Sequence, residues 1–516
     1  MSRRGNVLLG MFFLIIFANS SYRFASIEQA YYREEVRIGA MPAWLALPVP
    51  PPVGRFGPPD PPSPRPPVVI VQHGFSASRQ AMDWIVRGLV RNGFAVLAAD
   101  FRGHGQNPTP FNFGELSDDI ASLVAYAQSR PEVNGNRIAL IGHSMGAAAV
   151  YAYAFQHPDI DAVVPISGSA LGGDPQRPHN ALLIYASGDP QSIRAMDRAA
   201  MTRLDGGFDG LLSVTHGDLG AGTARRLVEV PGNDHVTILF SEVPMREIVD
   251  WLRGTWGLPA APFQASPPGT LREGLIGVVT GLLVFFPLAG FLAAAILRIR
   301  PVPGKSEPGG VWMAGVAVLV AGVALFGGTP LSFMPFVAGN QLVSFFLIAG
   351  AIYAVWLRWR QPPVDSSWTE RIRAVLLGIA AFALVYATYG TAVSRLFFNI
   401  TLDSQRFVWF VCVSVLFLPL GIGLESALRP AGGWRAVVRS LAAKVLILIG
   451  LMLAINTFGT LPPVIGLMIP SLAIVLPIIE AVAARLYTVS GSALASGVLT
   501  ALFLAWLPAA IFPIGY

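Results

Sequence analysis

Short apolar runs alternate with amphipathic stretches through the first half of the chain. Residues 67–72 and 93–99 are apolar runs of strand length, and residues 78–92 between them place apolar side chains at helical spacing. A further apolar run at 137–141 leads toward the helix-forming residues 147–151. Strands and helices that alternate in this way build a parallel sheet with helices on both faces. The pattern therefore predicts an α/β fold with a doubly wound, mostly parallel sheet.

The pattern changes near Leu271, after which the chain is almost continuously apolar. A helix needs about 20 apolar residues to cross the hydrocarbon core of a bilayer. Over the whole chain 53% of residues are hydrophobic and 13% are charged, a composition typical of membrane proteins. We expect an all-α polytopic domain with transmembrane helices at residues 273–297, 311–329, 339–357, 373–395, 407–424, 437–457, 462–480 and 491–513.

A shorter apolar run, residues 7–18, follows Arg3 and Arg4 at the beginning of the chain. It is short for a membrane span and typical of the core of a signal peptide or a signal anchor. The proline-rich residues 48–67 are expected to form an extended surface loop. The expected organisation is a signal peptide or anchor at 1–20, an α/β domain at 21–258, a linker at 259–272 and a membrane domain at 273–516.

Positive residues gather in alternate loops of the membrane half. Arginine or lysine follows the first, third, fifth and seventh expected spans, whereas the loops 327–340 and 457–461 contain neither. The remaining loop carries Arg395 and Arg406. Because such residues accumulate on the cytoplasmic side, we expect a multi-pass protein of the cell membrane whose α/β domain is extracytoplasmic. The net charge of +6 reflects these loops, so it does not imply nucleic-acid binding.

We expect the centres of the transmembrane helices to lack Asp, Glu, Lys, Arg and His. Ion-coupled transport normally requires such groups deep in the bilayer, so their absence argues against a transporter. Lys444 and Glu480 are the nearest candidates. We interpret both as residues near the cytoplasmic ends of their helices, where a lysine extends to the interface and a carboxylate meets water.

One motif of the first half carries chemistry. Gly142-His143-Ser144-Met145-Gly146 lies between the apolar run 137–141 and the helix-forming residues that begin at Ala147. A strand, a sharp turn and a helix in this order hold the central serine in a strained conformation, and the flanking positions must then be small. The motif and its context are those of the nucleophile elbow of serine hydrolases.

Two further motifs follow predicted strands, His73-Gly-Phe75 and Asp100-Phe-Arg-Gly-His-Gly105. With the elbow, they make residues 30–255 resemble the α/β-hydrolase superfamily, in particular its lipase-, esterase- and serine-peptidase-like members. The resemblance implies an oxyanion hole formed by the backbone N–H groups of Phe75 and Met145.

The resemblance also implies the chain order serine, acid, histidine. The strand run 181–186 leads to Asp189, and the strand run 226–230 leads to His235. We assign Ser144 as the nucleophile, His235 as the general base and later acid, and Asp189 as the group that fixes the imidazole tautomer.

Alternatives to two of these assignments stay open at this point. Asp174 also follows a strand and is an alternative acid, and His216 and His179 are alternative bases. His104 and His143 are expected to be structural. No metal or cofactor is expected, because no ligand spacing such as H-E-x-x-H occurs and the single cysteine, Cys412, lies in a span.

The connection 168–180 is too short for the helical cap that many lipases insert after the nucleophile helix. An open site beside a membrane domain favours an enzyme that hydrolyses an ester of a lipid or another hydrophobic acyl compound. Three alternatives remain: an acyltransferase, a serine peptidase with the same residues, and a membrane transport or assembly protein whose hydrolase-like domain binds a ligand without catalysis.

Overall fold

The computed structural model describes residues 3–28, 31–48, 65–168, 172–206, 208–266, 268–297, 306–361, 366–396 and 398–515. The chain divides into two compact units. We call them the sheet unit, which comprises residues 22–273, 395–399 and 513–516, and the helix unit, which comprises residues 1–21, 274–394 and 400–512. Most of the expected proline-rich loop, residues 49–64, lies outside the described residues.

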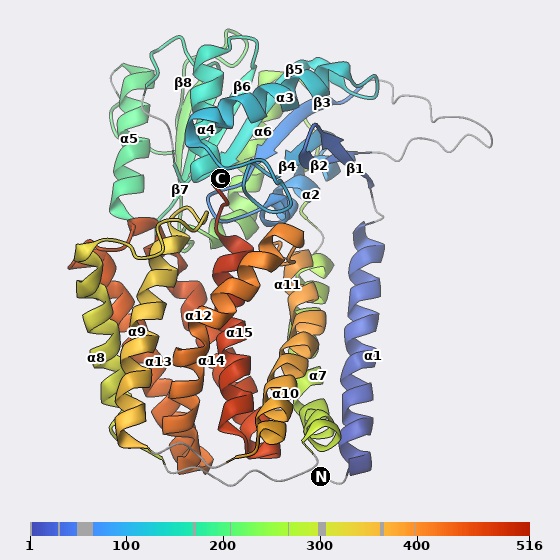
Figure 1. Ribbon diagram of the computed structural model, residues 1–516. Coiled ribbons are helices and arrows are strands. Elements are labelled where there is room, and N and C mark those ends of the chain that lie inside the picture. Colours follow the sequence, from blue (N-terminus) through green and yellow to red (C-terminus); the bar gives the residue numbers. More distant parts are fainter. Residues whose placement is uncertain are drawn as a thin grey trace. The chain divides into compact units, whose positions relative to one another are not determined.

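Within the described residues, nine strands form one sheet in the order β1-β2-β4-β3-β5-β6-β7-β9-β8 (Figure 1). The strands are β1 (Tyr32–Ile38), β2 (Met41–Leu47), β3 (Pro67–Gln72), β4 (Ala95–Ala99), β5 (Asn134–His143), β6 (Ala162–Ile166), β7 (Ala181–Ala186), β8 (Thr215–His216) and β9 (Arg225–Val230). The six strands from β4 to β9 in the sheet order pair in parallel, and β1, β2 and β8 pair antiparallel. The predicted mostly parallel sheet is confirmed.

The core of the sheet unit follows from the apolar runs. Every residue of β3, β4, β6 and β7 is buried, as expected for strands covered on both faces. On one face, Val69, Ile141 and Ile184 pack with side chains of α2 and α6, and α3 and α4 contact each other and the sheet (Figure 1). These helices are α2 (Asp83–Arg91), α3 (Leu116–Ser129), α4 (Met145–Gln156) and α6 (Glu242–Thr255), and α5 (Gln191–Asp205) contacts β7 and β9.

Two late segments of the chain belong to the sheet unit by their contacts. The backbone of Ile514 donates to the carbonyl of Gly103 at 3.0 Å and accepts from the N–H of Phe111 at 2.7 Å. The N–H of Asn399 donates to the Ser78 hydroxyl at 3.0 Å. Both segments follow the expected linker 259–272 and adjoin apolar helices in the chain, so the sequence places them in the membrane domain.

The helix unit contains long apolar helices that pack with one another (Figure 1). They are α1 (Arg3–Glu28), α7 (Pro268–Ile296), α8 (Gly310–Ala324), α9 (Gly339–Arg360), α10 (Trp368–Val385), α12 (Ser404–Leu428), α13 (Gly433–Asn456), α14 (Ile469–Ser490) and α15 (Ala493–Ile511). The short helix α11 (Thr391–Leu396) follows α10 within the same candidate span. The last residues of α1 and α11 and the first residues of α7 lie in the sheet unit. The backbones of α12 and α15 approach closely, because a Cβ atom on Gly421 would lie 2.5 Å from the Gly497 carbonyl oxygen.

All eight expected spans correspond to helices of the described residues, and α1 adds a ninth segment long enough to cross a bilayer. The span of α1 covers 23 residues, Gly5–Ile27, because polar flanking residues extend the helix beyond the apolar run 7–18. The expected span 462–480 is displaced to Leu472–Ser490. Pro470 lies in the first turn of α14, where proline starts a helix instead of interrupting one.

The interpretation of Lys444 and Glu480 as residues near helix ends is wrong. Lys444 lies in the middle of the 24-residue helix α13, and Glu480 lies in the middle of the 22-residue helix α14. Both residues are 3% exposed. The expectation that the span centres lack ionisable residues therefore fails at these two positions.

Candidate active site

Ser144 occupies the sharp turn between β5 and α4. Its backbone has φ 55° and ψ −114°, a conformation that costs a residue with a side chain of the order of 1–3 kcal/mol. A Cβ atom on Gly142 would lie 2.2 Å from the Gly146 carbonyl oxygen, and one on Gly146 would lie 2.5 Å from the His73 carbonyl oxygen. Only glycine fits at these positions, so the turn has the geometry that the elbow motif predicts.

The structure brings together Ser144, His235 and Asp189, which follow β5, β9 and β7. The Ser144 hydroxyl lies 3.0 Å from His235 Nε2, and His235 Nδ1 lies 2.6 Å from Asp189 Oδ1. The three strands are parallel, so their carboxyl ends meet at one edge of the sheet. The Asp189 side chain is 0% exposed and that of His235 is 11% exposed. A serine, an imidazole and a carboxylate are thus linked in the order that nucleophilic catalysis requires.

Hydrogen bonds keep Asp189 ionised although it is buried. Burial alone would raise the pKa of this carboxyl group, but hydrogen bonds from His235, the Ser167 hydroxyl and the Ala186 N–H lower it below its usual range. Ser167 and Ala186 donate to Oδ2 at 2.7 and 2.8 Å, which leaves Oδ1 for the imidazole. Ser167 belongs to none of the motifs identified in the sequence. The feature of the sequence that could have indicated it is its position directly after β6.

The alternative acid and bases take part in other contacts. Asp174 Oδ1 accepts from the N–H groups of Gln176 and Arg177 at 2.8 and 2.9 Å, as in a local turn. His216 Nδ1 lies 3.4 Å from Asp205 Oδ2, and the ring of His179 lies against Gly222. The hydrogen-bonded chain at Ser144 therefore contains Asp189 and His235.

Two buried histidines support the site as neutral imidazoles. His143 Nε2 donates to the backbone carbonyl of His235 at 2.8 Å, and burial lowers the pKa of His143 to about 3. His73 Nδ1 donates to the Gly74 carbonyl at 2.8 Å and Nε2 accepts from the Phe101 N–H at 3.0 Å. Burial also lowers the pKa of His73. His143 thus holds the loop that carries His235.

His143 should make the sheet unit sensitive to acid. Its pKa is about 3 in the folded state and near 6.5 when exposed, so below pH 6.5 the unfolded state binds a proton that the folded state does not. The free energy of unfolding should fall by about 1.4 kcal/mol per pH unit from this residue between about pH 6 and 4. Hydrogen exchange of β3 and β5 amides, corrected for intrinsic rates, measures this slope. His143→Gln should reduce it, and an unchanged slope would contradict the assignment.

The two expected oxyanion donors border the nucleophile. Met145 is the first residue of α4, where backbone N–H groups have no intrahelical partner and favour negative charge. The loop after β3 passes close to Ser144, because a Cβ atom on Gly74 would lie 3.1 Å from Ser144 Cβ. Phe75 follows Gly74 in this loop.

An aromatic cluster surrounds the Phe75 side chain. Its ring centroid lies 5.7 Å from that of His104, 5.8 Å from Phe111 and 6.1 Å from Phe113, with which it is stacked. Phe113 is 61% exposed. The cluster presents an apolar wall next to the residue expected to donate to the oxyanion.

The motif 100–105 shapes the loops beside the site. Asp100 is buried, forms an ion pair with Arg79 and accepts from the N–H groups of Arg79 and Gln106 at 2.8 and 3.0 Å. Gly105 has φ 53°, and a Cβ atom there would overlap the Asp100 carboxylate. Asp100 therefore joins the loops after β3 and β4.

The order of the strands and the strained serine at a strand end are those of the α/β-hydrolase fold, and the described residues also contain several helices long and apolar enough to cross a membrane. Comparison with known proteins agrees. Residues 63–190 match the family described as serine aminopeptidase, S33.

Individual relatives are distant. The chain is 28% identical over 173 residues to a monoacylglycerol lipase of Mycolicibacterium smegmatis, which covers 31% of this chain and 61% of the relative. It is 28% identical over 113 residues to the sn-1-specific diacylglycerol lipase ABHD11 of Mus musculus, which covers 21% and 35%. A dienelactone hydrolase structure from Anabaena variabilis matches 45% of this chain and 99% of its own at 18% identity, with a TM-score of 0.31. The chain spans less than two thirds of the length of the curated relatives it matches.

Proposed function

We propose that this protein is a membrane-embedded serine hydrolase that cleaves an ester, of a lipid or another hydrophobic acyl compound, through an acyl-enzyme on Ser144. The observation that carries the proposal is the hydrogen-bonded chain from the Ser144 hydroxyl through His235 to Asp189, with distances of 3.0 and 2.6 Å. In this chain the serine also has the strained backbone of a nucleophile elbow.

The first half of the reaction uses all three side chains. His235 Nε2 takes the proton from the Ser144 hydroxyl while Oγ attacks the ester carbonyl carbon. Asp189 accepts the Nδ1–H of His235, so Nε2 is free to act as the base and the imidazolium that forms is stabilised. The N–H groups of Met145 and Phe75 face the developing oxyanion.

The second half returns the proton and frees the enzyme. The imidazolium of His235 donates the proton to the departing alcohol oxygen, and the C–O bond to that oxygen breaks to leave an acyl-Ser144 ester. Water then attacks this ester with His235 as the base and releases the carboxylic acid. An alcohol or amine in place of water would make the protein an acyltransferase with the same residues.

A hydrophobic substrate is supported by three observations. The aromatic wall at Phe75 is apolar and partly exposed at Phe113. The described part of the connection between β6 and β7 contains no helix that could act as a cap. Two relatives carry the names monoacylglycerol lipase and diacylglycerol lipase.

The distribution of arginine supports an extracytoplasmic sheet unit. Arg3 and Arg4 precede α1, and Arg358, Arg360 and Arg371 lie around the connection from α9 to α10. If α1, α7, α8 and α9 each cross the membrane once, these two groups lie on the same side. By the positive-inside rule that side is cytoplasmic, and the sheet unit, which follows α1, is on the other side.

A tagged fluorophosphonate, which captures activated serines, tests the nucleophile. Membranes that carry the wild-type protein should be labelled, and the label should disappear in Ser144→Ala. Ser122→Ala, which removes an exposed hydroxyl on α3, is the matched control and should be labelled like the wild type. Folded wild-type protein that takes up no label would overturn the proposal in favour of a ligand-binding domain.

A serine peptidase is the second candidate, because the matching family is described as serine aminopeptidase. One substrate panel separates the two functions: monoacylglycerol in vesicles, soluble short-chain esters, and aminoacyl anilides. We expect hydrolysis of the lipid ester to exceed that of the other two. Cleavage of the anilides alone would identify a peptidase, and cleavage of the soluble esters alone would contradict the lipid substrate.

A further inference from the structure

Two loops of the sheet unit meet at the side chain of Phe75, the expected oxyanion donor. The loop after β3, residues 73–78, carries Phe75 itself. The loop after β4, residues 100–111, carries His104 and Phe111, whose ring centroids lie 5.7 and 5.8 Å from that of Phe75 and 5.1 Å from each other. Both rings are buried. The position of Phe75 therefore depends on the two loops together.

The segment 513–515 binds the loop after β4. The N–H of Ile514 donates to the Gly103 carbonyl at 3.0 Å, and its carbonyl accepts from the N–H of Phe111 at 2.7 Å. Ile514 is 4% exposed. Gly103 has φ 71°, and a Cβ atom there would lie 2.7 Å from the Ile514 carbonyl oxygen and 2.5 Å from Phe111 Cβ. The loop is thus closely fitted to this segment, and only glycine fits at the contact.

Asn399 binds the loop after β3. Its N–H donates to the Ser78 hydroxyl at 3.0 Å, and both residues are buried. At the other end of the same loop, a Cβ atom on Gly74 would lie 3.1 Å from Ser144 Cβ. Phe75 thus lies between one end of the loop that adjoins the nucleophile and another end that Asn399 holds.

Buried side chains of the helix unit hold the residues that adjoin these two contacts in the chain. Arg406, which is 2% exposed, donates through Nη1 at 2.9–3.0 Å to three carbonyls at the end of α15, those of Ala509, Ala510 and Phe512. Such carbonyls have no intrahelical partner. Trp506 Nε1 donates to the Ile400 carbonyl at 2.8 Å. Ile400 directly follows Asn399, and residue 513 directly follows Phe512, so each contact is continuous with a residue that is held in place.

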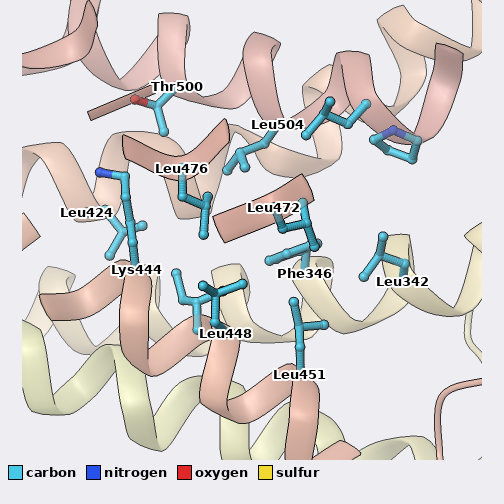
Figure 2. Close-up of a pocket in the computed structure, with 13 residues that line it drawn as sticks. Leu342, Phe346, Leu424, Lys444, Leu448, Leu451, Leu472, Leu476, Thr500 and Leu504 are labelled. Carbon is cyan, nitrogen blue, oxygen red and sulfur yellow. The ribbon is translucent and has the colours of Figure 1, made fainter. Parts of the chain in front are cut away.

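Helix α15 is a firm support for the segment 513–515. Among the described helices that are long and apolar enough to span a membrane, it is the most deeply buried. Figure 2 shows a cavity to which α15 contributes Leu504. The lining is almost entirely apolar, and the volume of about 30 Å³ holds no more than about two or three water molecules. Even beside this cavity α15 is therefore closely packed, and its last residues have little room to shift.

We propose that Ser78 and Ile514 are positioning residues of the candidate active site, which hold the oxyanion donor Phe75 through the loops after β3 and β4. The inference rests on the proposed function, because it gives these residues a part in ester hydrolysis. An oxyanion donor must lie about 2.7–3.1 Å from the oxyanion. A misplacement of about 1 Å can lower the rate by about 10²-fold. Each residue acts on Phe75 through its loop and not on the substrate.

Loss of either contact should affect the transition state more than the bound substrate. The oxyanion forms only when Ser144 attacks, so a displaced donor lowers kcat and leaves KM nearly unchanged. The pH dependence of kcat/KM should stay that of the wild type, because His235 keeps its bonds to Ser144 and Asp189. A general loss of folding would instead lower the number of active sites and leave the rate constant of the remaining ones unchanged.

Two shortened chains test Ile514. A variant that ends at Phe512 lacks both bonds of Ile514, whereas a variant that ends at Gly515, the matched control, keeps them. In membranes that carry the protein, the rate constant of fluorophosphonate labelling should fall about 10- to 100-fold in the first variant and equal that of the wild type in the second. The final amount of label counts the folded sites separately. Equal rate constants in the two shortened chains would overturn the proposal.

Ser78→Ala tests the other contact in the purified full-length protein and removes only one hydroxyl group. For hydrolysis of p-nitrophenyl butyrate, kcat should fall about tenfold, with KM and the midpoint of the pH profile unchanged. Ser122→Ala, at an exposed position, is again the control. Wild-type kcat in Ser78→Ala, or a shifted pH midpoint, would overturn the role of Ser78. Wild-type protein that takes up no fluorophosphonate would overturn the proposed function, whereas equal rate constants in labelled proteins would overturn this inference alone.

Discussion

Asp189→Asn is expected to lower kcat/KM for ester hydrolysis by about 10⁴-fold, the loss seen when the acid of a Ser-His-Asp triad becomes an amide. The carboxylate oxygen that accepts the Nδ1–H of His235 lies 2.6 Å away, and an amide NH₂ at this place would favour the tautomer with the proton on Nε2. That tautomer cannot take the proton of Ser144. The measurement is steady-state hydrolysis of an ester by the purified full-length protein.

Asp174→Asn is the matched control for this prediction. Asp174 caps a local turn, so its replacement should change kcat/KM by less than about threefold, which corresponds to a surface substitution. The opposite pattern, with loss of activity in Asp174→Asn and retention in Asp189→Asn, would contradict this assignment and identify Asp174 as the acid that pairs with His235. Circular dichroism of both variants checks that they are folded.

Arg429→Met should destabilise the helix unit by about 3–5 kcal/mol, the range observed when one partner of a buried ion pair is removed. Arg429 forms buried ion pairs with Glu425 and Glu480, so its loss leaves Glu425 without a cation and Glu480 with Lys444 alone. Unfolding in mixed detergent micelles, followed by helical circular dichroism, measures the change. Arg435→Met, at an exposed position of α13, should leave the stability nearly unchanged.

A compensating variant makes this prediction sharper. Arg429→Met combined with Glu425→Gln removes one charge of each sign, and Glu480 keeps its contact with Lys444. This double variant should recover part of the lost stability. If Arg429→Met is as stable as the wild type, the buried ion pairs of Arg429 have no energetic role in the fold.

The sheet and the candidate site could be predicted from the sequence, because each depends on short apolar runs and on the residues that directly follow them. Ser144, Asp189 and His235 each follow a short apolar run, and parallel strands bring the residues at their carboxyl ends to one edge. The hydrogen bonds from Ser167 and His143 were not predicted, since a buried serine or histidine near a motif has no pattern that distinguishes it from a packing residue.

The buried ion pair of Lys444 and Glu480 shows what a linear pattern omits. Lys444 and Glu480 are 36 positions apart on different helices, and each appears alone in its own apolar run. Hydropathy shows that an ionisable residue is costly in a span, but it does not show which residue compensates it. The length of α1 was underestimated for a related reason, because the polar residues after Ala18 continue the helix without contributing to hydropathy.

The contact of Ile514 with Gly103 and Phe111 has a consequence for biosynthesis. These partners are separated by more than 400 residues, and the apolar helices from α7 to α15 lie between them in the chain. During translation, the segment before Glu273 emerges long before residue 514 does. The loop after β4 therefore stays without this partner until the ribosome has synthesised the membrane helices, and the sheet unit reaches its final form only afterwards.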